Sequence, residues 1–153
     1  MPPASRTLDP ESRAARRLEN RRIDVDRLLL HSRHLPPDEL ALVRGIYERG
    51  MTLVDLARAA SLSRQRLRTR LNRALDRLAD PAFRYVLERQ QRWPPARRDI
   101  ARLVVLHGRT WRAAAAALGV SLHQVRREIE RIRILATRDE RDDRDQRDSR
   151  DDV

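Results

Sequence analysis

The strongest constraint on the fold is an internal repeat with an offset of 58 residues. At this offset, residues 35–37 (LPP) align with residues 93–95 (WPP), and the two copies continue without a gap. Paired positions include Gly50 with Gly108, Thr52 with Thr110, Ala57 with Ala115, and Ser63 with Ser121. A repeat of this length indicates one supersecondary unit that occurs twice.

Each copy of the repeat predicts three helices. Pro37 suits the first position of a helix that runs to Arg49, and Gly50 suits its carboxyl-terminal cap. Thr52 can cap a short helix to about Ala60, and Ser63 can cap a third helix to about Leu78. In the second copy the corresponding helices are expected over residues 95–107, 110–118 and 121–136.

A short helix, a tight turn and a longer helix are typical of a helix-turn-helix. This unit needs a small residue where its helices cross, and both copies have alanine there. Its turn favours a residue that tolerates positive φ, which Gly119 does better than Ser61. An apolar residue must then pack back on the first helix. The residues that meet these demands are Ala57, Ser61 and Leu67 in the first copy and Ala115, Gly119 and Val125 in the second.

The sequence therefore predicts an all-α fold with tandem three-helix units. Residues 137–153 hold no apolar side chain before Val153 and are rich in Asp, a poor helix former, so we expect disorder there. The expected organisation is a flexible segment 1–8, a basic helix 9–34, a first helix-turn-helix unit 35–79, a connecting helix 80–92, a second unit 93–136 and a disordered mixed-charge tail 137–153.

Residues 35–39 (LPPDE) and 50–57 (GMTLVDLA) resemble the opening of domain four of the sigma-70 family of bacterial RNA polymerase subunits. The resemblance covers about 45 residues per copy. It implies that residues 63–73 form a DNA recognition helix and that the RNA polymerase core is a second partner. The family's promoter-melting domain has no counterpart here, and response-regulator effector domains share a similar unit.

Charge supports a polyanionic partner. The net charge is +11, and all 34 basic residues are arginine. The helix expected over 63–78 has six arginines and one aspartate, whereas the helix over 121–136 has four arginines and two glutamates. We therefore expect the first unit to be the main reader of double-stranded DNA, with Glu128 and Glu130 repelling the DNA backbone from the second.

Residues early in a recognition helix reach base edges, and arginine and glutamine can pair with guanine and adenine. Arginines further along the helix contact phosphates, which position the protein without reading sequence. The predicted DNA-binding residues are Ser63, Arg64, Gln65, Arg66, Arg68, Thr69, Arg70, Arg73 and Arg77 in the first unit, and His123, Gln124, Arg126 and Arg127 in the second.

The sequence offers no catalytic constellation. It has no cysteine, no glycine-rich phosphate loop and no cluster of histidines with carboxylates, so we expect no enzyme, cofactor or metal site. No apolar run approaches the roughly 20 residues that span a bilayer, so we expect a cytoplasmic protein without membrane contact. Two alternatives remain: a module that docks on RNA polymerase or another regulator without reading DNA, and a DNA-packaging accessory such as a phage terminase small subunit.

Overall fold

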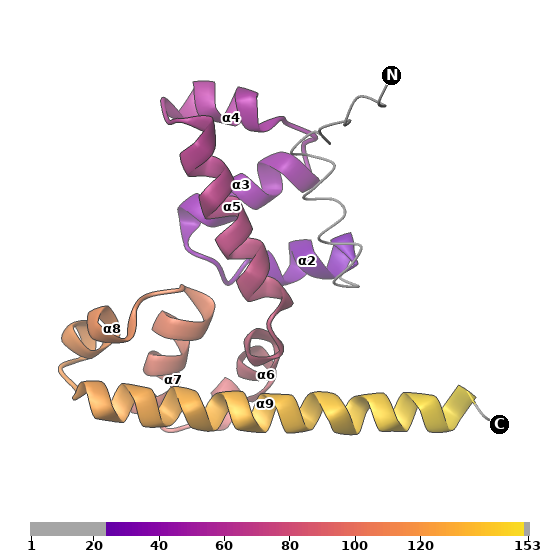
Figure 1. The fold of residues 1–153 in the computed structure, drawn as a ribbon, viewed down its shortest axis with the longest axis vertical. Coiled ribbons are helices and arrows are strands. Elements are labelled where there is room, and N and C mark those ends of the chain that lie inside the picture. Colours follow the sequence, from indigo (N-terminus) through magenta and orange to yellow (C-terminus); the bar gives the residue numbers. More distant parts are fainter. Residues whose placement is uncertain (1–23, 152–153) are drawn as a thin grey trace, which may run out of the picture. The chain divides into compact units, whose positions relative to one another are not determined.

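The structure is a computed structural model, and it describes residues 24–151 (Figure 1). Every regular element in that range is helical, which confirms the all-α expectation. The elements are α2 (Val25–Ser32), α3 (Pro37–Tyr47), α4 (Leu53–Ala60), α5 (Arg64–Ala79), α6 (Pro81–Arg89), the 3-10 turn η1 (Gln90–Arg92), α7 (Pro95–Ala101), the π turn η2 (Arg102–Leu106), α8 (Trp111–Leu118) and α9 (Leu122–Asp151).

The described residues divide into two compact units. Unit 1 comprises residues 24–33 and 37–75, and α3 contacts both α2 and α4 in it. Gly45 lies where α3 meets α4, and a Cβ there would come within 3.0 Å of the Leu56 side chain. The buried apolar side chains of this unit are Leu28, Leu42, Val43, Leu53, Leu67, Leu71, Ala74 and Leu75.

Unit 2 comprises residues 34–36 and 76–151, and α9 is its central element. Helices α6, α7 and α8 all pack against α9. Phe83, Val86 and Ile100 bury completely on one side of this contact, and Val125 and Ile129 do so on the other. Because α9 supplies the surface on which three helices meet, its outward face is fixed by the packing of its inward face.

The carboxyl-terminal tail differs from the expectation. Residues 137–151 are not disordered, because α9 continues without a break to Asp151 (Figure 1, orange to yellow). Arg89 contacts Asp139 at 3.1 Å and Arg84 contacts Asp143 at 3.0 Å, which holds this part of α9 on α6. These ion pairs, with the Arg144–Glu140 pair along the helix, offset the low helix propensity of Asp.

The other expected boundaries shift by a few residues. The expected helix over 9–34 is described only from residue 24, where Asp24 caps α2, so its earlier part and the flexible segment 1–8 lie outside the described residues. The connecting helix 80–92 appears as α6 followed by η1. The helix expected over 95–107 appears as α7 followed by η2.

Candidate nucleic-acid interface

Unit 1 contains the helix-turn-helix as α4, a turn at Ser61 and α5. The N–H of Asp55 donates to Thr52 Oγ1 at 3.1 Å, and the Asp55 carboxylate accepts from the Thr52 N–H at 3.2 Å. Hydrogen bonds from Thr52 hold the pKa of Asp55 below its usual value. This capping box fixes the start of α4. Ser61 has φ 53° and turns the chain into α5, and Leu67 is buried at the crossing as predicted.

Unit 2 has the same backbone features at the 58-residue offset. Met51 N–H donates to Gly45 O and Arg109 N–H to Leu103 O, each at 2.9 Å. Both turns that precede the third helix are left-handed, and both third helices are capped by a serine. The left-handed residues are Ser61 and Gly119, and the capping serines are Ser63 and Ser121. The hydrogen bond from Leu62 N–H to Ala57 O corresponds to the one from Val120 N–H to Ala115 O.

The first turns of α5 expose the predicted base-reading residues. Arg64, Gln65, Arg66 and Thr69 are all exposed, and Arg73 is exposed one turn further along. Within residues 24–151, none of the three arginines forms an ion pair. These donors are therefore available to an external partner.

Three other arginines of α5 that were predicted to bind DNA make contacts within the protein or have buried atoms. Arg70 approaches Asp38 of α3 at 3.6 Å between Nη1 and Oδ2. The Nε of Arg68 is buried without a hydrogen-bond partner. The guanidinium of Arg77 packs against Gly108 so closely that a Cβ there would overlap it. The structure therefore groups Arg64, Gln65, Arg66, Thr69 and Arg73 but not these three residues.

The start of α9 is less basic at its surface. His123 and Arg127 are exposed, whereas Gln124 is half-buried. Arg126 donates from Nε to Glu130 at 2.8 Å, and this hydrogen bond raises the pKa of Arg126. Early positions that would meet bases therefore carry no free arginine before Arg127.

Glu128 does not face outward as the charge count assumed. Its side chain is 15 % exposed and accepts a 2.7 Å hydrogen bond from Arg97 Nε on α7. Its charge is matched inside unit 2, so the expected repulsion of DNA by this residue is smaller than the sequence suggested. Sequence reasoning counted Arg131 in the charge of this helix but assigned it no contact, and it left out Arg138 and Arg141 because it ended the helix at Ala136. The spacing of these arginines along the sequence was the available signal.

Within the range that the structure describes, no group of three or more histidine, aspartate or glutamate side chains could hold a metal ion. None of the helices between residues 24 and 151 combines the length and apolar composition needed to cross a bilayer.

Comparison with known proteins identifies the first unit. Residues 33–80 match the family described as sigma-70, region 4. No curated protein and no solved structure matches the chain. The matched segment contains α3, α4 and α5 and ends just before α6. Residues 33–80 are therefore a helix-turn-helix domain like sigma-70 region 4, a DNA-binding domain with a role in transcription.

Proposed function

We propose that the protein is a transcription regulator that binds double-stranded DNA and reads the major groove mainly with α5. The observation that carries this proposal is the exposed group formed by Arg64, Gln65, Arg66 and Thr69 on the first turns of that helix, whose arginines form no ion pair within residues 24–151. Arginine can donate two hydrogen bonds to guanine, and glutamine can pair with adenine. Their position at the start of the second helix of the motif is where base-reading residues occur.

The second unit acts as a further helix-turn-helix on the same DNA. Its support is the repeated set of caps and left-handed turns at the 58-residue offset. Leu122, His123 and Gln124 stand where the first unit has Arg64, Gln65 and Arg66. Fewer charged donors early in the helix make this unit the weaker reader of sequence.

The test begins with selection of bound sequences from random duplex DNA, followed by binding measured by fluorescence anisotropy. Replacing Arg66 with alanine should cost about 1–3 kcal/mol and relax the preference for one base. Arg127→Ala should cost less and leave the preference intact. Arg92→Ala, which removes an exposed arginine of η1, is the matched control. Equal losses for Arg66→Ala and Arg127→Ala would contradict the assignment of α5 as main reader.

A second candidate is a module that docks on RNA polymerase without reading DNA. Its support is the match of residues 33–80 to sigma-70, region 4, and Val54 of α4, which is 46 % exposed, is the side chain chosen to test it. Affinity for duplex DNA near zero at low salt, together with binding of polymerase core that Val54→Ser weakens, would select this candidate over the first.

A further inference from the structure

The outward face of α9 carries a line of arginines. Val125, Ile129, Ile132 and Ala136 are buried and define the inward face. On a helix with 3.6 residues per turn, the opposite side passes through four exposed arginines, which we call the arginine ridge. The ridge consists of Arg127, Arg131, Arg138 and Arg141.

The acidic residues between the ridge arginines are neutralised inside unit 2. Glu128 pairs with Arg97 of α7 and Asp139 with Arg89 of α6. Glu130 and Glu140 pair with neighbours along α9 itself, Arg126 and Arg144. Within residues 24–151 no ridge arginine forms an ion pair. The outward face is therefore more positive than the charge count of the helix suggests.

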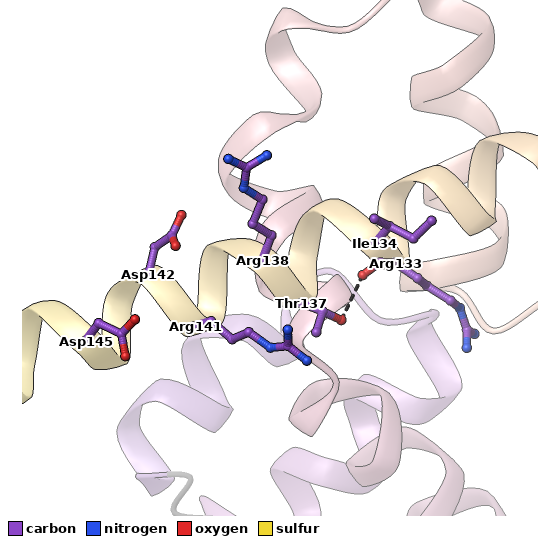
Figure 2. Close-up of a pocket in the computed structure, with 7 residues that line it drawn as sticks. All are labelled: Arg133, Ile134, Thr137, Arg138, Arg141, Asp142 and Asp145. Atoms are coloured by element: carbon purple, nitrogen blue, oxygen red, sulfur yellow. Dashed lines mark hydrogen bonds between the residues drawn. The ribbon is translucent and has the colours of Figure 1, made fainter.

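Figure 2 shows the outer part of this face. Arg138 and Arg141 extend to opposite sides of the α9 axis, and the side chain of Ile134 lies one turn before them. Ile134 is 70 % exposed, the highest value among the exposed large apolar side chains of the described residues. Asp142 and Asp145 follow the ridge and line the same open groove, so the sign of the charge reverses after Arg141.

We propose that the arginine ridge binds the phosphate backbone of duplex DNA, independent of sequence. This inference rests on the proposed function. It adds a phosphate-binding surface on unit 2 to the base reading by α5. From Arg127 to Arg141 the ridge spans about 21 Å, at 1.5 Å per residue. Arginines on the two sides of a helix can reach phosphates on both walls of a groove, while an exposed isoleucine can contact the sugars between them. The contact ends at Asp142, because the acidic residues from there on repel phosphate.

A second copy of the chain fits the same face less well. In an antiparallel arrangement, Arg138 and Arg141 would meet Asp145 and Asp142 of the other copy. Exposed ion pairs of this kind contribute little each, and association must also offset the loss of translational and rotational freedom. DNA differs because every phosphate contact releases condensed counterions, which favours binding by an arginine row even without a buried apolar area.

The test compares two triple variants of the full-length protein that remove the same charge from α9. The ridge variant is Arg131→Gln, Arg138→Gln and Arg141→Gln; the control is Arg144→Gln, Arg147→Gln and Arg150→Gln, on the other sides of the helix. Binding to fluorescent duplexes of selected and scrambled sequence is measured across salt. The slope of log K against log salt is negative, and its magnitude should decrease by about 2.7 for the ridge variant, at about 0.9 per phosphate contact. The control should change the slope by less than about 1.

Further readouts keep the result interpretable. The ridge variant should lower affinity for both duplexes by the same factor and keep the wild-type helical content in circular dichroism. A third variant with lysine at the three ridge positions should restore the slope, because lysine binds phosphate as a point charge.

Equal slope changes in the ridge and control variants, or loss of sequence preference in the ridge variant, would overturn the inference. A difference in sedimentation between the ridge variant and the wild type, both without DNA, would also overturn it, because it would assign the ridge to self-association. An unchanged slope in the ridge variant, when the wild-type protein binds DNA, would overturn only the proposal for the ridge. Failure of the wild type to bind any duplex would overturn the proposed function as well.

Discussion

At the scale of single residues, Ser61 and Gly119 occupy the same turn of the two units with left-handed backbone. Ser61 has φ 53° and Gly119 has φ 64°. This conformation costs a residue with a Cβ about 1 kcal/mol or more of conformational free energy, whereas glycine adopts it without steric strain. We therefore expect Ser61→Gly to raise the free energy of unfolding by about 1 kcal/mol, measured by urea denaturation.

The reciprocal change at Gly119 is the control. A Cβ there would meet nothing within 4 Å, so Gly119→Ser changes only the backbone cost and should destabilise by about 1 kcal/mol. The same sign for both substitutions would contradict this account. The sequence indicated the difference between the two turns, because it placed glycine in one and serine in the other.

Tyr47 offers a prediction about pH. Its hydroxyl is buried without a hydrogen-bond partner, and burial raises its pKa from 10.0 to about 12. Between these pH values the unfolded chain releases the proton while the folded chain retains it, so stability falls as pH rises. The chain has no lysine that would titrate in the same range.

Replacing Tyr47 with phenylalanine should remove this part of the alkaline destabilisation. The variant should also be as stable as the wild type at pH 7 or more stable by up to about 1 kcal/mol, because a buried unpaired hydroxyl is costly. Thermal unfolding followed from neutral pH to pH 12 measures both effects. Parallel pH profiles for the two proteins would refute it, since Tyr85 is present in both.

At the scale of elements, the two units join their first and third helices with ion pairs of opposite polarity. Arg97 of α7 donates to Glu128 of α9 in unit 2, and Asp38 of α3 contacts Arg70 of α5 in unit 1. At the 58-residue offset, Glu128 corresponds to Arg70, and Arg97 corresponds to Glu39, the neighbour of Asp38. A helix of one unit would therefore meet like charge if it packed in the other, which disfavours exchange between the repeats.

A charge-reversal cycle tests the pair in unit 2. Arg97→Glu and Glu128→Arg should each destabilise by roughly 2 kcal/mol, because both side chains are largely shielded from solvent. The double variant should recover at least half of the summed loss in urea unfolding. The same cycle on the exposed Arg126–Glu130 pair should yield a much smaller coupling, because solvent screens both charges. If the destabilisations of the two single variants simply added in the double variant, the Arg97–Glu128 pair would contribute no interaction energy to stability.

How far the elements could be predicted depends on the range of the interactions that form them. The starts of α3 at Pro37, α4 after Thr52 and α5 after Ser63 follow from local capping, and the sequence predicted them. The helical tail could not be predicted in this way. Its contacts Arg89–Asp139 and Arg84–Asp143 join residues 50 and 59 positions apart, which no local propensity contains.

The candidate site was predictable to a similar degree. The exposed start of α5 follows from the position of the motif, so Arg64 to Arg66 and Thr69 emerge on its surface as the pattern indicated. The pairing of Arg70 with Asp38 and of Glu128 with Arg97 depends on how helices pack. A charge count treats these residues as free, and for that reason it overestimated the difference in surface charge between α5 and α9.

At the scale of the whole molecule, the proposal that both units bind DNA has a measurable consequence. If both hold the same duplex, binding of one raises the effective concentration of the other. The losses caused by weakening each unit then multiply. If the units bind only as alternatives, the stronger one sets the affinity and weakening the other changes little.

We expect the first behaviour. Arg64→Ala with Arg66→Ala weakens unit 1, and the ridge variant Arg131→Gln, Arg138→Gln and Arg141→Gln weakens unit 2. These substitutions share no partners within residues 24–151. Their effects on the free energy of binding should therefore add to within about 0.3–0.5 kcal/mol. Affinity of the four proteins of this cycle for one selected duplex, at a single salt concentration, gives the answer. The contrary outcome has two parts: the ridge variant binds like the wild type, and the ridge substitutions lower affinity only when unit 1 is already weakened. This result would mean that the two units bind DNA as alternatives, because the weaker unit then contributes only when the stronger one no longer binds.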